Sequence, residues 1–169
     1  MAMPRKLKNF NVFYNGDNYI GRCSEVELPK LTRKTEDLQA GGMNGPVKVD
    51  LGNEGLEINH TYAGFEAEIF RQYAAATADS VLLRFAGAYQ RDDTGDVDAV
   101  EIVARGRHTE IDLGSAKAGD DTELKVKSDL SYYKLSVNGE TLVEIDLLNF
   151  VENIGGADLL SGIRSAIGL

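Results

Sequence analysis

Residues 123–146 read "ELKVKSDLSYYKLSVNGETLVEID", and this stretch decides the fold class. Asn138-Gly139 separates two runs in which apolar and polar residues alternate, which is the strongest short-range signal for a β-hairpin. Apolar side chains occupy even-numbered positions in the first half of the longer run and odd-numbered positions from Tyr133 onward. A β-bulge, or a bend that carries the strand into a second sheet, changes the phase in this way. We therefore expect a long strand with an irregularity just before Tyr133.

The same kind of pattern recurs along the chain. Residues Leu56–Tyr62 alternate strictly between apolar and polar side chains, which is typical of a half-buried strand. Turn residues separate strand-like runs in three predicted hairpins: 9–14 with 19–26 around "NGDN", 81–90 with 97–112 around "RDDTGD", and 123–137 with 141–146.

Helical signals are few. Residues Phe65–Ala78 place apolar side chains at helical spacing and are rich in helix formers, which predicts the one main helix. The C-terminal segment 157–169 predicts a short helix that begins near Asp158. We expect one domain over residues 1–169, mainly β, with two packed antiparallel sheets in a sandwich or barrel flanked by the main α-helix.

Residues 38–53, "LQAGGMNGPVKVDLGN", do not fit a short turn. A hairpin needs two to five residues to reverse direction, so we interpret these sixteen as a long inter-strand loop with Met43 in its middle. Ordering sixteen backbone units costs roughly 16–30 kcal/mol in conformational entropy. We therefore expect the loop to be ordered by a neighbouring molecule or to stay mobile without one.

Charge and cysteine content exclude several classes of protein. The formal net charge is −9, and a surface of this sign repels nucleic acid, so adhesion to DNA or RNA is not expected. Cys23 is the only cysteine, which excludes an internal disulfide. No apolar run follows the basic N-terminus and none is long enough to span a bilayer, so we expect neither a signal peptide nor a membrane anchor, and synthesis in the cytoplasm.

A search for chemistry finds no site. Of the two histidines, His60 lies on the apolar side of its predicted strand and is expected to be buried, whereas His108 stands among charges and is expected at the surface. Residues Asp92–Glu101 fail the register of a calcium loop, and "GGMNG" lacks the Gly-Lys-Ser/Thr of a phosphate loop. We expect no catalytic residue, no cofactor and no metal, and hence no enzyme. The remaining classes of function are assembly and binding.

Several blocks of the chain nevertheless carry a resemblance. They are "MAMPRKLKNFNVF" (1–13), "LPKLTRKTE" (28–36), "GGMNGPVKVDLG" (41–52), "RFAGAYQRDDTG" (84–95), "RGRHTEIDLG" (105–114) and "LVEID" (142–146), and the final "IGL" fits as well. The sequence resembles, from Met1 to Leu169, the major tail tube proteins of contractile-tailed bacteriophages, a family shared with R-type bacteriocins. Residues 53–78 carry no matching block.

The resemblance implies a structural protein of the virion tail, assembled in the bacterial cytoplasm. Subunits of this family join in hexameric rings, and rings stack helically into a rigid tube. A contractile sheath drives that tube through the bacterial envelope. The implied partners are further copies of the chain, the tail sheath protein, the tape-measure protein, and the baseplate and tail terminator proteins. DNA is only passing cargo in a phage, and in a bacteriocin the open tube breaches the membrane.

The long loop then acquires a hypothetical role in stacking one ring on the next. The candidate residues are Leu38, Gly41, Gly42, Met43, Asn44, Gly45 and Pro46. The acidic excess suits a conduit for DNA, and strands within 81–112 and 123–146 are expected to supply carboxylates to the lumen. The alternative from another class is a monomeric β-sandwich module that binds a ligand or carbohydrate, which would present an exposed aromatic platform.

Overall fold

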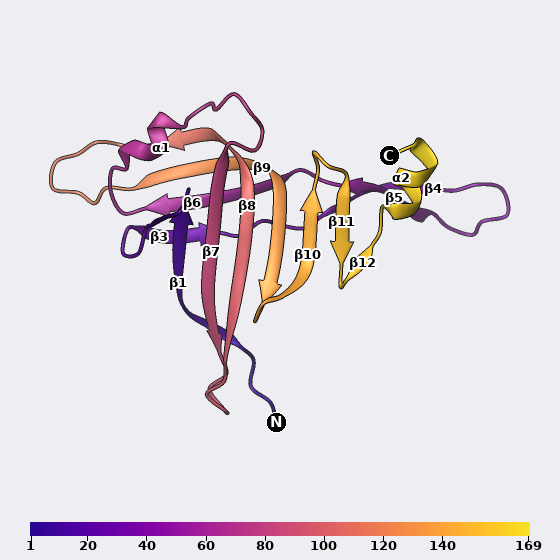
Figure 1. The fold of residues 1–169 in the computed structure, drawn as a ribbon, viewed down its shortest axis with the longest axis horizontal. Helices are drawn as coiled ribbons and strands as arrows, with labels where there is room; N and C mark the ends of the chain where they lie inside the picture. The colour runs from indigo at the N-terminus through magenta and orange to yellow at the C-terminus, as the bar shows by residue number, and fades with distance from the viewer.

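Twelve strands and two short helices make up the fold in the computed structural model, which describes residues 1–169 (Figure 1). The strands are β1 (Lys6–Tyr14), β2 (Asp17–Asn18), β3 (Cys23–Glu27), β4 (Arg33–Leu38), β5 (Val47–Asn53), β6 (Leu56–Tyr62), β7 (Val81–Gln90), β8 (Val97–Asp112), β9 (Leu124–Val137), β10 (Glu140–Asp146), β11 (Val151–Ile154) and β12 (Ala157–Asp158). The helices are α1 (Ala67–Arg71) and α2 (Ser161–Ile167). The predicted mainly β, antiparallel fold class is confirmed.

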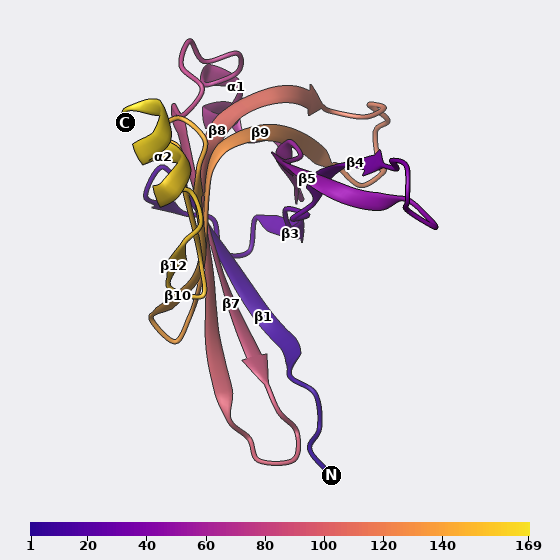
Figure 2. The same ribbon diagram turned by 90° about the vertical axis from the view of Figure 1, so that its right-hand side faces the viewer.

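Ten of the strands form one curved sheet. Its order is β12-β11-β10-β9-β8-β7-β1-β2, and β6 pairs with β9 on one side and with β3 on the other. The remaining strands, β4 and β5, pair only with each other. In Figure 2, β8 and β9 bend over the top of the molecule, so that both strands run through an upright layer and a second layer roughly across it.

The bend lies at the predicted change of phase in β9. Up to Leu130 this strand pairs with β6, and from Tyr132 onward it pairs with β10 on the same side. Ser131 between them is unpaired with β8, because Arg105 faces Tyr132 and Gly106 faces Leu130. Both Leu130 and Ser131 are buried, so the extra residue lets the strand keep its apolar side chains inward beyond the corner. The predicted bulge is confirmed.

Gly106 is required at this corner. A Cβ atom built on Gly106 would lie 2.0 Å from the carbonyl oxygen of Asp129 on the neighbouring strand, closer than any atom can approach. The conflict is with backbone, which cannot rotate aside. The close approach of β8 and β9 at this corner therefore depends on the absence of a side chain at position 106.

The core lies inside the curve of the sheet. It consists of 17 buried apolar residues, contributed chiefly by β1, β6, β7, β8 and β9, with Ile69 of α1 covering one end. His60 is buried, as predicted, and β6 shows the expected alternation of burial. The predicted hairpin of β7 with β8 is confirmed, and so is the turn at Asn138-Gly139, where both residues have positive φ.

Four expectations were wrong. The first concerns His108, which was expected at the surface and is only 1% exposed. The main helix is only Ala67–Arg71, because Ala74 takes a positive φ and the rest of the predicted helix forms turns. "NGDN" does turn the chain, but β3 leaves β1 after this turn and pairs with β6 instead. Residues 38–53 are not an irregular loop, because Val47–Asn53 form β5 and only residues 39–46 turn.

Candidate assembly surfaces

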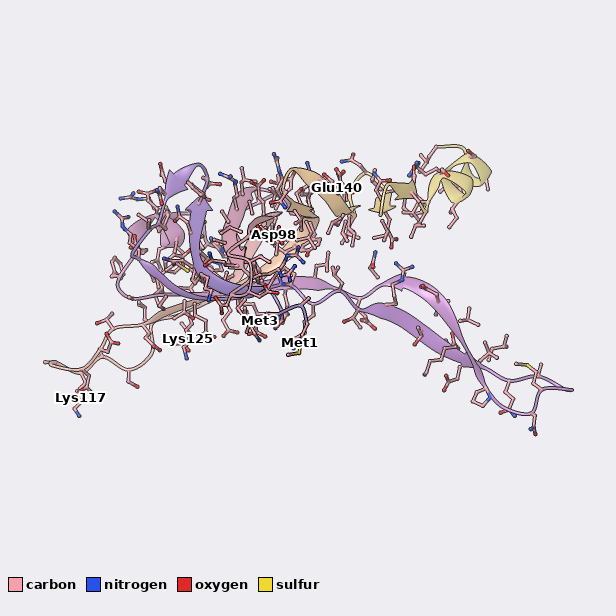
Figure 3. All side chains as sticks on the ribbon, turned by 90° about the horizontal axis from the view of Figure 1, so that it is seen from below. Met1, Met3, Asp98, Lys117, Lys125 and Glu140 are labelled. Atoms are coloured by element: carbon pink, nitrogen blue, oxygen red, sulfur yellow. The ribbon has the colours of Figure 1, made fainter.

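The β4–β5 hairpin projects from the sheet as an arm, the name used below for residues 33–53. It extends away from the end of the molecule that carries the loop of residues 113–123, on which Lys117 lies (Figures 1 and 3). Arg33 fixes its base, since the guanidinium donates to Asp50 over 2.8 Å and to Asn53 over 3.1 Å and pairs with the buried Glu152 of β11. The hydrogen bond from Arg33 lowers the pKa of Asp50.

The arm has one apolar and one polar face. Leu38 stands opposite Val47, and Val49 and Leu51 follow on the same face of β5, all four being 40–56% exposed. The β4 residue opposite Val49 on this face is Glu36, so the aliphatic stripe runs mainly along β5. The opposite face is polar and is made of Thr35, Asp37, Lys48 and Asp50. A stripe of four exposed aliphatic side chains on a free two-stranded sheet is an unsatisfied surface, of the kind that protein partners cover.

The side chain of Met43, at the tip, packs on its own turn. Its sulfur accepts the Ala40 N–H over 3.2 Å and its own N–H donates to the Ala40 carbonyl over 3.1 Å, so the side chain folds over its own turn and is half-buried. Gly42, with a φ of 88°, allows this reversal. Of the predicted stacking residues, Gly41, Gly42, Met43, Asn44, Gly45 and Pro46 form the tip and Leu38 ends β4. The exposed aliphatic residues of β5 were missed, although their alternation was visible in the sequence.

The open edge of β1 is a second surface. β2 covers only Phe13 and Tyr14, so residues 6–12 have no strand beside them on that side. The side-chain oxygens of Asn9 and Asn11 accept the N–H groups of Phe10 and Val12, over 2.9 and 2.8 Å, which partly caps the edge. At the opposite end of the sheet the last strand, β12, has only two residues. Both devices limit uncontrolled pairing between edges.

Ion pairs hold the N-terminal segment against the turn between β7 and β8. Arg5 pairs with Asp98, and Lys8 donates to Asp92 over 2.6 Å. Asp93 accepts from the Met3 N–H over 3.0 Å, and the hydrogen bond from Arg91 together with this one lowers its pKa to about 2.

The C-terminal region is a third surface. Arg164 of α2 pairs with Asp158 and donates to the carbonyl of Phe150 over 2.9 Å, which fixes the helix beside β11 and β12. None of the α2 residues is buried. Large apolar side chains of this region remain exposed, namely Leu147, Leu148, Ile154, Leu159, Ile163, Ile167 and Leu169.

The structure shows neither a metal-binding cluster nor a membrane-spanning helix. No three His, Cys, Asp or Glu side chains gather where they could hold a metal ion, and neither helix is long and apolar enough to cross a membrane. The shallow hollow beside the outer face of β6 is lined by charged residues of both signs, including Glu25, Glu110 and Lys125. The conspicuous features of the surface are therefore the arm, the open strand edge and the apolar C-terminal region.

Comparison with known proteins identifies the family to which this chain belongs. Residues 4–168 match the family model described as phage tail tube protein FII. This chain belongs to the phage tail tube protein family. Over 172 aligned residues it is 50% identical to the tail tube protein of Escherichia phage P2, covering 100% of both chains, and 45% identical to the major tail tube protein of Serratia phage KSP20, covering 100% of this chain and 99% of the relative.

Solved structures show the same fold at low sequence identity. A chain from the sheath–tube complex of an extracellular contractile injection system (PVC) in its extended state has a TM-score of 0.60 at 11% identity, over 79% of this chain and 91% of that one. A chain from the baseplate of the anti-feeding prophage has a TM-score of 0.58 at 10% identity, over 80% and 97%. The tail tube family consists of structural proteins of the virion tail and not of enzymes. Membership of the tail tube family rules against the alternative hypothesis of a monomeric binding module.

Proposed function

We propose that copies of this chain close head to tail into hexameric rings and that the rings stack helically into the rigid inner tube of a contractile tail. Membership of the tail tube family supports the tube role. The ten-stranded sheet supports ring closure, because it presents the open edge of β1 at one end and the two-residue β12 at the other. A head-to-tail contact between the two ends satisfies each edge with a neighbour and leaves none free once the ring closes.

The single observation that carries stacking is the exposed apolar face of the arm. Leu38, Val47, Val49 and Leu51 are not covered within the subunit, where each is 40–56% exposed. Burying aliphatic side chains in a neighbour gains about 25 cal/mol for each Å² of apolar surface. The arm, including the tip residues Gly41–Pro46, therefore reaches the next ring and packs its apolar face there. Arg33 at its base sets the direction in which it projects.

The proposed partners follow from the same role. They are further copies of the chain within and between rings, the sheath protein around the tube, the tape-measure protein inside it, and the baseplate and terminator proteins at its ends. The structural relatives, which come from a sheath–tube complex, a sheath/tube terminator and a baseplate, favour the sheath, terminator and baseplate proteins among these partners. The tube then breaches the envelope and, in a DNA-carrying particle, conducts the genome.

The net charge of −9 supports a lumen that does not bind DNA. The outward face of β7–β10 carries both signs, with Arg84, Arg105 and Lys134 against Glu101, Glu144 and Asp146. The charges of this face are therefore balanced. The β7–β8 turn and the start of β8 add Asp92, Asp93, Asp96 and Asp98, of which Asp92, Asp93 and Asp98 pair with Lys8, Arg91 and Arg5. An assembled tube whose lumen carries more Lys and Arg than Asp and Glu would overturn this part of the proposal.

Electron microscopy of the purified protein tests the assembly directly. Negative-stain images are expected to show rings with six-fold symmetry in end view and hollow tubes in side view. A protein that stays a monodisperse monomer across concentrations and salt conditions would contradict the proposal. Rings with another symmetry would contradict the hexamer alone and leave the tube.

A further inference from the structure

The C-terminal region, residues 147–169, is the densest apolar surface of the subunit. Seven of the 21 large apolar side chains that the subunit exposes lie in this segment. The arm carries four more, and the others are scattered along the rest of the chain. Exposed apolar side chains gathered in this way mark a surface that a protein partner covers.

The helix α2 within this region receives little support from its own subunit. It has seven residues and none of them is buried, whereas an isolated helix needs roughly 12–15 residues to be stable in water. Ile163 and Ile167 are four residues apart, so they lie on one face of the helix, and they are 50% and 61% exposed. A helix of this length depends on packing of its apolar face, and here that face is open to a neighbour.

The C-terminal region is also nearly free of net charge. Its only charged side chains are Glu152, Asp158 and Arg164. Glu152 pairs with Arg33 at the base of the arm, and Asp158 pairs with Arg164. Depletion of charge is the compositional mark of the core of a protein interface.

The arm has the same electrostatic character where it projects furthest. Residues 38–47 contain no charged side chain, and nearer the base Asp37 pairs with Lys48. Each subunit carries a net charge of −9, so two copies repel one another over most of their surface. The repulsion is smallest where the uncharged part of one copy meets the neutral part of another, which favours contact between the arm and the C-terminal region.

The spacing of the side chains on the two surfaces is similar. Residues four apart on a helix, such as Ile163 and Ile167, are separated by about 6 Å along the axis. Alternate residues of a strand, such as Val47, Val49 and Leu51, repeat about every 6.7 Å. A helix lying along β5 can therefore place its two isoleucines between the aliphatic side chains of the strand.

The two surfaces do not meet within one subunit. Figure 1 places α2 and the arm at the same end of the molecule, and Figure 3 shows the arm (purple) and α2 (yellow) diverging from each other. Arg33 ties the base of the arm to Glu152, while Val47 and Ile163 both remain exposed. Each surface therefore needs a partner from outside its own chain.

We propose that the C-terminal region of a second copy is the surface that receives the arm, with the Ile163 and Ile167 face of α2 packed along β5. This inference rests on the proposed stacking of rings and names the acceptor in that contact. The contact joins two unlike surfaces, so every subunit donates one arm and accepts another. Such a heterologous contact repeats without closing, as the growth of a tube requires.

Crosslinking of assembled protein tests the contact directly. The native thiol is first removed by Cys23→Ser, and Val49→Cys and Ile163→Cys are then combined in one chain. A short bismaleimide, which tolerates a shift of one residue in register, is expected to produce a ladder of covalent oligomers longer than the dimer. A mixture of the two single-cysteine chains is expected to give dimers and no longer products.

The control is Thr35→Cys combined with Ile163→Cys, which moves the thiol to the polar face of the same arm and is expected to give no ladder. Tubes of the Val49→Cys and Ile163→Cys chain that give no ladder would overturn the inference and leave the stacked tube in place. Monomers crosslinked internally would also overturn it, because the arm would then reach its own C-terminal region. A parent chain that forms no tubes would refute the proposed function and this inference together.

A charge on α2 gives an independent test. Ile163→Lys is expected to reduce tube formation roughly tenfold or more and to leave the urea midpoint of the subunit unchanged, because the side chain is exposed before assembly and buried after it. Ser165→Lys places the same charge on the opposite face of α2 and is expected to assemble as the parent does. Normal tubes from Ile163→Lys would show that α2 faces another protein, such as the sheath, and would refute the inference.

Discussion

β9 and β5 have the same alternation of apolar and polar residues and opposite fates. In β9 the alternate side chains Leu124 and Val126 are buried inside the curve of the sheet. In β5 the alternate side chains Val47, Val49 and Leu51 lie in solvent on a free arm. Alternation therefore shows that a face is intended for burial, but not whether the same molecule buries it. In an assembling protein the second kind of face marks an interface.

The largest effect on stability is expected at the corner where β8 and β9 bend. Gly106→Ala is expected to destabilise the subunit by about 4 kcal/mol or to prevent folding, because the new methyl group must displace the β9 backbone at Asp129. Urea unfolding followed by circular dichroism measures the change. Gly55→Ala is the control, since its Cβ meets nothing within 4 Å, and it is expected to change stability by less than about 1 kcal/mol. Equal effects of the two substitutions would show that the corner is not tightly packed.

A substitution on the apolar face of the arm is expected to impair assembly and to leave the stability of the subunit unchanged. Val47→Lys places a charge on its apolar face and should reduce assembly into tubes more than tenfold, while the subunit keeps its stability to within about 0.5 kcal/mol. Sedimentation and negative-stain images measure assembly. Thr35→Lys adds the same side chain to the polar face of the same arm and is expected to assemble normally. Normal tubes from Val47→Lys would remove the arm from the stacking contact.

Lowering the pH is expected to reduce the free energy of unfolding through the core, and not through the arm. The pKa values of His60 and His108 in the folded protein are below the value of 6.5 for a free imidazole, so the unfolded chain binds more protons between these values. Stability is then complete above pH 6.5 and falls as the pH is lowered toward 4, by about 2 kcal/mol for each imidazole between pH 7 and pH 5. Urea midpoints of the Val47→Lys subunit at these two pH values measure the loss without a contribution from assembly. An unchanged midpoint would contradict it.

Met43 gives the smallest expected effect and sharpens the role of the tip. Because this side chain is folded on its own turn, Met43→Asp is expected to reduce tube formation less than Val47→Lys does. Counting tubes in electron micrographs at matched protein concentrations compares the two. Tubes in normal number would show that the tip is not part of the stacking element, and the strand face alone would remain.

The sequence predicts what local pattern controls and fails where tertiary contacts decide. Asn138-Gly139, the β7–β8 hairpin and the bulge before Tyr133 were all visible, since turn chemistry and side-chain period are local. The helix over 65–78 was overestimated, because its spacing fits a helix but the sheet holds Gln72 and Tyr73 in another conformation. His108 was misplaced because its neighbours along the strand, Arg107 and Thr109, point to the other face.

The candidate surfaces were predicted less completely. Glycines and a proline drew attention to residues 41–46, which do form the tip, and hid the strand that begins at Val47. Alternation of Val47, Val49 and Leu51 could have revealed it. The open edge of β1 depends on how far β2 extends beside it, which only the fold determines.

The bulge at Ser131 also has a mechanical consequence. β8 and β9 pass from one layer to the other without interruption, so the two layers are joined by covalent backbone and not only by packed side chains. A push on one layer is transmitted along these strands as compression of a continuous chain, and the layers cannot slide past one another at the corner. A subunit built in this way resists both axial compression and sliding between its layers, and axial compression is the load that a thin hollow rod meets when it is driven end-on through a barrier.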